Sequence, residues 1–415
     1  MKERREEAGR VVALCVMSFF GLMSYAFSRS TIESMLTDAY GKDGLLNAWL
    51  MMAAAAFVVV TLYNRLAERM APIRLFGGSM GVTLGLLLAL MAMDRAEVPG
   101  TPYLLFVWKD LYIVFLVEIF WTYANSVYPP KQARWAYGLF LMMGSLGGML
   151  GNLIVAPVAA RWGAESVLWL VFPALLIAWA ACVVVDRKIK GVGPRKGDEQ
   201  RAGGFLEGLR VLAGSRYMVL LFVLIMATQV AITLIDYEYN AALLEAYPDK
   251  DLRAGVGGQV YAAIDICALA LQLLTGPILA AVGIPRTLLG IPLVLAGAVS
   301  LFVAAPQFLT MAVAKVASKC FDYSLFRAAK EILYIPLSPL ERVQGKAVVD
   351  ILAYRITKGA VTLFLKGALA LIALPTLIMG LTLFVIGGWI LVTHLLLKAH
   401  RRRLAEDADA VAAAA

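Results

Sequence analysis

The chain has 415 residues, of which 61% are hydrophobic and 16% are charged, and its formal net charge at pH 7 is +9. A hydrophobic content this high excludes an ordinary soluble protein and indicates a polytopic helical membrane protein. The basic residues gather in short loops and at the chain ends, so they report membrane orientation and predict no nucleic-acid partner.

Apolar runs of about 20 residues or more mark the membrane-spanning helices. The first such runs lie near residues 10–36, 45–64, 73–94, 102–128, 131–160 and 165–186. Further runs lie near residues 215–246, 253–281, 284–304, 306–335, 339–370 and 375–398. The first run has no small-residue cleavage site, so we expect it to be retained. The sequence therefore predicts an all-α membrane protein with twelve transmembrane helices.

A segment rich in glycine and charge separates the two sets of runs. It is followed by a short amphipathic stretch, Phe205 to Leu212, that suits the membrane surface. We therefore divide the chain into four parts. They are a first six-helix half (1–187), a cytoplasmic linker with a short amphipathic helix (188–214), a second six-helix half (215–400) and a cytoplasmic tail (401–415).

Short motifs recur at one fixed separation. Asp38-Ala39-Tyr40 matches Glu245-Ala246-Tyr247, and Pro129 matches Pro336, each 207 residues apart (245 − 38 and 336 − 129). Parallel repeats of this kind are the pattern of major facilitator transporters, whose binding sites lie near the membrane midplane between the halves. Matches this short also arise by chance. The basic motif usual after the second span is not recognisable in residues 63–76, which indicates a divergent branch.

The distribution of basic residues predicts that both termini are cytoplasmic. Counted from a cytoplasmic N-terminus, the inside loops hold the basic residues Arg65, Arg69, Arg74, Lys131, Arg134, Arg286, Arg342 and Lys346, the 187–201 segment and the 398–403 cluster. The opposite loops are short and near neutral or acidic. We expect a bacterial inner membrane protein that is a monomer in the lipid bilayer.

Charged residues inside predicted spans are candidates for function, because a charge at the bilayer centre costs at least roughly 2.5–3.5 kcal/mol. At helical spacing Lys319, Asp322, Arg327 and Lys330 share a stripe on the tenth predicted span, and Asp350, Arg355 and Lys358 lie close together on the eleventh. An excess of cations on two facing helices suits an anionic substrate. Structural alternatives are that residues near the Pro336 turn reach the headgroups, and that Asp350 is a simple ion-pair partner.

Opposite charges occupy equivalent places in the two repeats. Arg29 in the first span and Asp236 in the seventh are 207 residues apart (236 − 29), with Glu238 two residues on. A pair between Arg29 and Asp236 would form a gate between the halves. The alternative is that Arg29 pairs with Glu33 on its own helix.

Several motifs around the tenth and eleventh spans resemble one family. Ser324-Leu325-Phe326, Lys330-Glu331, Tyr334 to Leu337 and then Gly345-Lys346-Ala347, Asp350, Arg355 and Lys358 resemble the corresponding helix pair of the ATP/ADP translocase type of nucleotide transporters. The resemblance covers about 35 residues and is thinner elsewhere. It implies a twelve-helix fold related to the major facilitator superfamily and a nucleotide substrate.

The resemblance also bears on the first, fourth and seventh spans. Arg29 to Glu33 looks like the Arg-Asp-Thr-Lys-Asp pattern of the family, but Ile32 stands at the family's lysine, which puts ATP/ADP exchange itself in doubt. Glu118 and Asp236 resemble the family's functional carboxylates. Because their sequence neighbours are apolar, Glu118 and Asp265 are also proton-coupling candidates, with a structural hydrogen bond as the alternative for Asp265.

These observations predict a secondary active transporter that moves an organic anion, with a nucleotide or related phosphorylated metabolite as the leading substrate. Exchange and ion-coupled transport both remain open. One alternative is a proton-coupled carrier of a zwitterion, peptide or drug, and another is a non-transporting membrane assembly or lipid-handling protein. No residue pattern predicts catalysis, a cofactor or a metal site.

Overall fold

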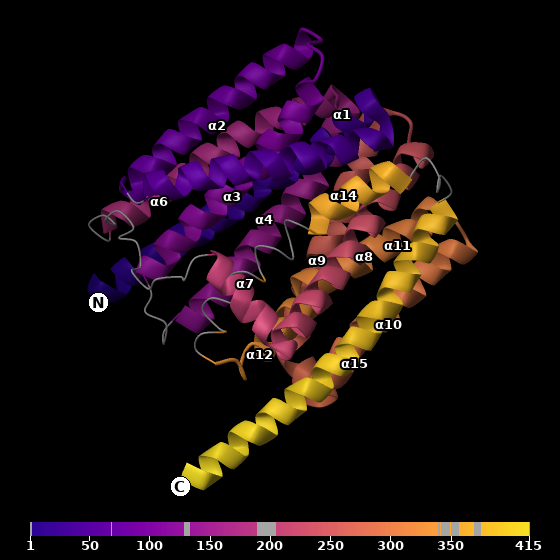
Figure 1. Cartoon of the computed structure of the whole chain (residues 1–415). Coiled ribbons are helices and arrows are strands. Elements are labelled where there is room, and N and C mark those ends of the chain that lie inside the picture. The colour runs from indigo at the N-terminus through magenta and orange to yellow at the C-terminus, as the bar shows by residue number, and fades with distance from the viewer. Residues whose placement is uncertain are drawn as a thin grey trace. The chain divides into compact units, whose positions relative to one another are not determined.

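The computed structural model describes residues 2–67, 69–127, 133–188, 205–338, 341, 349, 357–368 and 375–414. Every regular element within these ranges is a helix (Figure 1). Eight candidate membrane spans lie among the described residues. The all-α membrane architecture is therefore confirmed, and the count of twelve spans stays a prediction.

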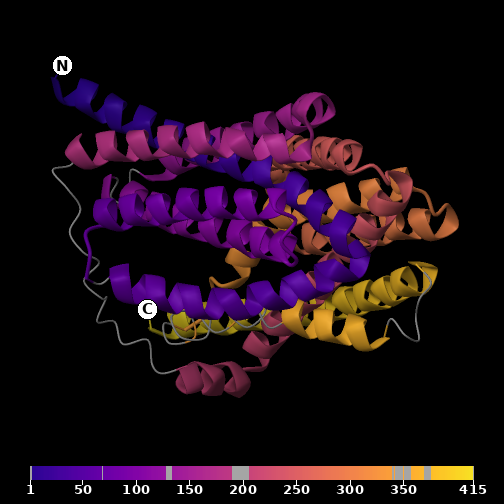
Figure 2. The same ribbon diagram turned by 90° about the horizontal axis from the view of Figure 1, so that it is seen from above.

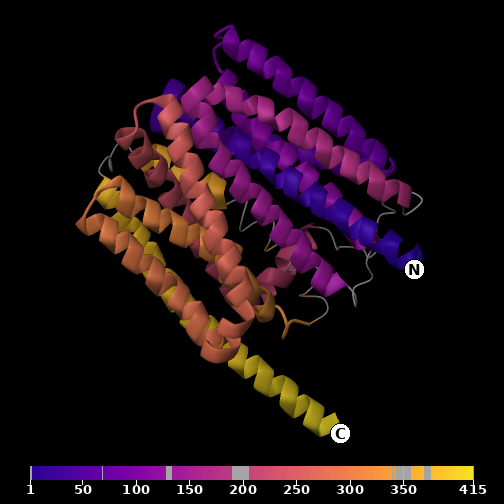
Figure 3. The ribbon, with the colours of Figure 1, turned by 180° about the vertical axis from the view of Figure 1, so that it is seen from behind.

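The first compact unit comprises Met1–Asp198 together with Leu243–Ile266. Within it α1 packs extensively against α3, α4 and α6, and Figure 3 shows these helices side by side. The helices before the predicted linker are α1 (Lys2–Ala67), α2 (Pro72–Arg95), α3 (Thr101–Val127), α4 (Ala133–Trp162), the short α5 (Ala164–Val167), the 3₁₀ turn η1 (Leu168–Leu170) and α6 (Val171–Lys188).

The element α1 consists of two helices joined at Gly41. A continuous helix of 66 residues would be about 100 Å long, far more than the roughly 30 Å of a bilayer core. Gly41 has φ 62° and ψ −168°, a conformation that favours glycine because it has no Cβ. The chain reverses its direction within α1 (Figure 2). This reversal lies between the first and second predicted spans.

Glycines on α4 allow its close approach to α1. A Cβ on Gly151 would lie 2.8 Å from the carbonyl oxygen of Met23, and a Cβ on Gly147 would clash with the carbonyl of Phe19. Small residues at such contacts let two membrane helices pack backbone against backbone. This contact fixes α1, which carries Arg29, against α4.

The helices α8 (Arg216–Ala246) and α9 (Lys250–Val282) form a hairpin. Its tip, Leu243–Ile266, packs as part of the first unit although it comes from the second half of the sequence. Arg253 on this tip is 1% exposed, and its Nη2 donates to Asp38 Oδ1 at 2.9 Å. The backbone N–H of Ala164 donates to Asp251 Oδ1 at 2.7 Å. The compact units therefore follow a different boundary from the predicted halves.

The second compact unit comprises Glu199–Ala242 and Cys267–Ala415. Within it α10 lies beside both α11 and α15, as Figures 1 and 3 show. The helix α7 covers the stretch predicted to form a short amphipathic helix. The helices after the linker are α7 (Phe205–Gly214), α8 (Arg216–Ala246), α9 (Lys250–Val282), α10 (Ile284–Ala304), α11 (Phe308–Tyr323), α12 (Leu325–Leu333), α14 (Thr357–Ala368) and α15 (Pro375–Ala414).

The tenth predicted span, 306–335, is not one helix. It is interrupted at Ser324, whose backbone has φ −126° and ψ −98°, and it continues as α12. The amide Nε2 of Gln272 on α9 donates to the carbonyl of Tyr323 at 3.1 Å, which satisfies a backbone acceptor freed by the break. The prediction of one continuous charged stripe from Lys319 to Lys330 is therefore wrong, because the stripe is divided between α11 and α12.

An ion pair fixes the end of α15. The guanidinium of Arg403 donates to both carboxylate oxygens of Glu341 at 2.9 Å, and to Ser215 Oγ at 2.9 Å. These hydrogen bonds lower the pKa of Glu341 to about 2. Beyond this contact α15 continues to Ala414, so helix extends through most of the predicted tail.

Candidate functional site

Four charged side chains and one tyrosine form a cluster in the first unit, which we call the α1–α3 cluster: Arg29, Glu33, Lys109, Asp110 and Tyr261. Lys109 on α3 is 1% exposed, and its Nζ lies 2.8 Å from Asp110 Oδ1 and 3.8 Å from Glu33 Oε1. Burying an ammonium group at this depth requires compensation by carboxylates or other acceptors. The cluster thus joins α1 to α3 by charge.

Tyr261 connects the two charges of α1 that the sequence predicts as an i, i+4 pair. Its hydroxyl donates to Glu33 Oε2 at 2.7 Å. The guanidinium carbon of Arg29 lies 3.6 Å from the centroid of the Tyr261 ring, a close cation–π contact. Tyr261 belongs to the Leu243–Ile266 tip, so one side chain of the tip contacts both Arg29 and Glu33 of α1.

Asp265 lies further along α9 in the same unit. The amide Nδ2 of Asn152 on α4 donates to Asp265 Oδ2 at 2.9 Å. A structural hydrogen bond of this kind is the alternative to a proton-coupling role for Asp265. The coupling role of Asp265 stays a prediction.

The second unit holds a corresponding group, the α8–α11 cluster: Asp236, Lys315, Lys319 and Tyr239. Lys315 Nζ donates to Asp236 Oδ1 at 2.7 Å, and Lys319 Nζ donates to Asp236 Oδ2 at 2.8 Å. Lys315 also lies 4.8 Å from the ring centroid of Tyr239. One buried carboxylate is therefore shared by two ammonium groups.

The two clusters have the same plan. In each, a carboxylate on the first helix of a repeat contacts a lysine on the fourth, Glu33 with Lys109 and Asp236 with Lys315. Lys109 plus the repeat separation of 207 falls at residue 316, one position from Lys315. The carboxylates do not follow this separation, because Glu33 plus 207 falls at Asn240, one helical turn after Asp236. The predicted pairing of Arg29 with Asp236 stays a prediction, and both oxygens of Asp236 are already bonded to lysines.

The other predicted site residues are dispersed. Glu118 and Arg327 are exposed, Glu238 is 2% exposed, and Lys358 is partly buried in the first turn of α14. Asp322 lies one turn beyond Lys319 on α11. Arg355 and Asp350 lie outside the described residues. Among the predicted site residues that the structure describes, it brings Lys319 Nζ and Asp236 Oδ2 to 2.8 Å.

Sequence reasoning missed Lys109 and Tyr261. Lys109 and Asp110 interrupt the apolar run 102–128, so the rule that selected the charges near Lys319 also applies to them. Tyr261 carries no such signal, because tyrosines are common on helix faces that pack or meet the headgroups.

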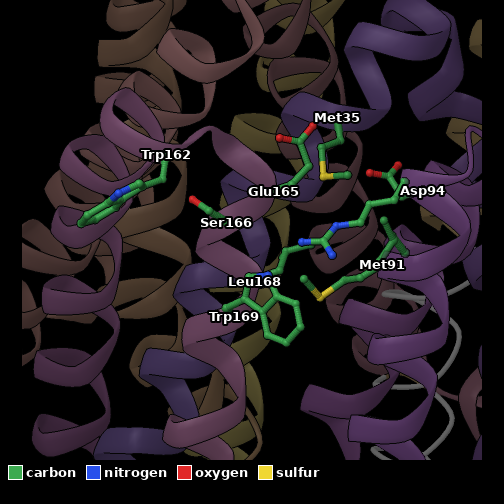
Figure 4. Close-up of a pocket in the computed structure, with 10 residues that line it drawn as sticks. Met35, Met91, Asp94, Trp162, Glu165, Ser166, Leu168 and Trp169 are labelled. Atoms are coloured by element: carbon green, nitrogen blue, oxygen red, sulfur yellow. The ribbon is translucent and has the colours of Figure 1, made fainter.

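A separate cavity of about 130 Å³ lies at the ends of α2 and α4 in the first unit (Figure 4). Met35 and Met91 line its apolar part, and Asp94, Glu165 and Trp169 contribute polar or aromatic groups. Ligand pockets usually have volumes of about 300–1,000 Å³. This cavity is therefore too small to be a nucleotide site.

The fold is similar to that of several solved transporters. The structure of the nucleoside transporter NupG matches with a TM-score of 0.64 and 10% identity, over 94% of this chain and 98% of that chain. The POT family transporter PepTSo matches with a TM-score of 0.66 and 10% identity, over 95% of this chain and 98% of that chain. At these identities the likeness shows the fold alone.

Sequence relatives are ADP,ATP carrier proteins. ADP,ATP carrier protein 1 of Chlamydia pneumoniae is 23% identical, over 92% of this chain and 90% of the relative. The proteins of the same name from Chlamydia trachomatis serovar D and Rickettsia prowazekii are 25% and 24% identical, but only 56% and 57% of their lengths are covered. The family model described as TLC ATP/ADP transporter matches residues 103–400. This match covers well over half of the 415 residues, so the chain belongs to the TLC ATP/ADP transporter family.

Proposed function

We propose that the protein is a secondary transporter that moves a nucleotide or a related phosphorylated anion across the membrane by alternating access. The observation that carries the proposal is the pairing of Lys315 and Lys319 with the single carboxylate of Asp236. Phosphate oxygens are strong acceptors for lysine, so an incoming phosphate competes with Asp236 for both ammonium groups. The relatives named ADP,ATP carrier proteins support this substrate class.

The α1–α3 cluster offers the second set of cations. Arg29 presents a planar guanidinium that suits two phosphate oxygens, and Lys109 supplies a buried point charge. In a rocking mechanism the substrate contacts residues of both halves near the midplane. Within the second unit we assign the phosphate groups to Lys315 and Lys319, and Arg29, Arg355 and Lys358 stay candidates from the sequence.

Twelve spans follow from the same proposal. The helix α1 is one of the eight candidate spans. Because the chain reverses at Gly41, α1 supplies two crossings instead of one. The helix α3, the α11–α12 pair and the region that contains α14 supply the other three crossings. A polypeptide with an even number of crossings has both termini on one side, and the excess of basic residues in the predicted inside loops supports the proposal that this side is the cytoplasm of a bacterial cell. As a transporter it needs no enzymatic activity.

A binding and exchange experiment tests the proposed function. Purified protein is melted with nucleotides, phosphorylated sugars and dicarboxylates, because a ligand at 100 times its Kd stabilises the fold by about 2.7 kcal/mol. Proteoliposomes preloaded with the stabilising ligand are then assayed for uptake of the labelled ligand. Lys319→Gln should weaken binding, whereas Arg286→Gln, an exposed residue at the start of α10, should not. Absence of both stabilisation and exchange for all three ligand classes would refute the function.

A further inference from the structure

A small cavity in the second unit holds an unpaired acid. It has a volume of about 10 Å³ and lies among α8, α10, α11, α12 and α15, where Asp322 is the one charged residue of its lining. A volume of this size accommodates about one water molecule. The Asp322 carboxyl makes no hydrogen bond or ion pair with any described residue.

The same cavity is lined by an indole that lacks an acceptor. Trp389 on α15 is 1% exposed, and its Nε1–H has no partner among the described residues. Its ring is held edge-on by Phe326, at a centroid distance of 5.8 Å. A buried donor without an acceptor costs about 1–3 kcal/mol. One water molecule in the cavity would supply the acceptor that this indole lacks and would face the Asp322 carboxyl across the same cavity.

The remaining polar groups of the lining cannot neutralise a carboxylate. The Ser318 hydroxyl donates to the carbonyl of Lys315 at 2.8 Å, and the Thr228 hydroxyl donates to the carbonyl of Leu224 at 2.9 Å. Both hydroxyl protons are therefore used within their own helices. Neither α10 nor α15 adds a charged residue to the lining.

The charged groups that act on Asp322 electrostatically are Lys319, Arg327, Lys330 and Asp236. Lys319 is the nearest in the helix, one turn before Asp322, and in this structure it is bonded to Asp236. Arg327 is exposed. An ionised carboxyl with no bonded cation inside a membrane domain is costly, whereas its protonated form is not.

We propose that Asp322 is a proton-binding site that couples transport to the proton gradient, through competition for Lys319. With a proton on Asp322, Lys319 is available to Asp236 or to the anionic substrate. When the proton leaves to water, the Asp322 carboxylate attracts Lys319 from one turn away and withdraws it from the substrate. Proton and anion therefore bind together, and Lys319 remains an ammonium throughout. This inference rests on the proposed transport function and chooses ion-coupled uptake over pure exchange.

The test compares exchange with gradient-driven uptake in proteoliposomes. A gradient of about one pH unit coupled to one proton supports about tenfold accumulation of the substrate. Asp322→Asn, which mimics the protonated acid, should lose this accumulation and keep exchange at symmetrical pH. Asp322→Glu should keep both. Glu331→Gln, which neutralises an exposed carboxylate on α12, is the matched control and should accumulate the substrate as the wild type does.

The outcomes separate the two proposals. Wild-type exchange with no response to the pH gradient, or a gradient response that survives in Asp322→Asn, overturns the proton site and leaves the transport function standing. Accumulation driven by a sodium gradient alone also overturns it. No exchange of any substrate overturns the transport function instead. Should Asp322→Asn fail to fold, infrared difference spectra of the wild type and Asp322→Glu decide, because a protonated carboxyl band at this site must shift between them.

Discussion

Replacing Asp236 by asparagine removes the charge that Lys315 and Lys319 share. The side chain of Lys315 is 2% exposed and that of Lys319 is 13% exposed, so water replaces the lost carboxylate poorly. Removing one partner of a buried ion pair typically costs about 3–5 kcal/mol. The cation–π contact of Lys315 with Tyr239 is retained and is worth about 0.5–2 kcal/mol. We therefore expect a net loss of about 3 kcal/mol.

The assay is thermal unfolding of the purified protein in detergent. For a compact unit of this size, about 3 kcal/mol corresponds to a fall in Tm of roughly 6–12 °C. Adding Lys315→Met to Asp236→Asn should restore at least half of the loss, because it removes one of the two uncompensated cations. Glu245→Gln, an exposed carboxylate on the same helix α8, serves as the control. A Tm of Asp236→Asn within about 1 °C of wild type, or a double variant no better than the single one, would refute the reasoning.

Three further predictions concern other contacts. Arg253→Gln should cost about 3 kcal/mol and speed hydrogen exchange in the turn between α8 and α9, because Arg253 is 1% exposed and bonded to a carboxylate; unchanged exchange would count against the contact. The Glu341 carboxylate should stabilise the fold by about 1 kcal/mol above about pH 4.5 and lose this effect as the pH falls toward 2, because its pKa is lower in the folded than in the unfolded state. Arg403→Gln should flatten this part of the pH profile of Tm. A profile parallel to that of the wild type would contradict the prediction. Arg355→Lys should weaken ligand binding more than Lys358→Arg, because only the guanidinium offers a planar fork; unchanged affinity with lowered stability would eliminate a substrate role.

Hydrophobic periodicity predicted the membrane helices well, because length and composition alone mark them. It failed at Ser324, where the sequence Phe321-Asp322-Tyr323-Ser324 contains no proline or glycine. The break is accompanied by a hydrogen bond from Gln272 on α9, a tertiary contact that no local pattern reveals. The packing of the α8–α9 tip is likewise not visible in a local pattern, since Arg253 contacts Asp38, 215 positions away, and Asp251 contacts Ala164, 87 positions away.

The cost of intramembrane charge pointed to Asp236 and Lys319 as candidates, and the structure pairs them. The same argument could not predict which charged side chains form ion pairs with one another. The repeat predicted that Asp236 pairs with Arg29. In the structure the carboxylate oxygens of Asp236 are bonded to Lys315 and Lys319 of the second unit. Helical spacing relates residues of one helix, but the partner of a buried charge is chosen by the packing of different helices.

The packing of Leu243–Ile266 within the first unit has a consequence for the protein when its chain is cut. A break in the predicted linker would put this segment on one fragment and the groups that bind it, such as Asp38 and the Ala164 amide, on the other. Each fragment alone would leave buried polar groups without partners. Fragments produced from two separate genes should therefore assemble without a covalent link, and each should be degraded when produced without the other.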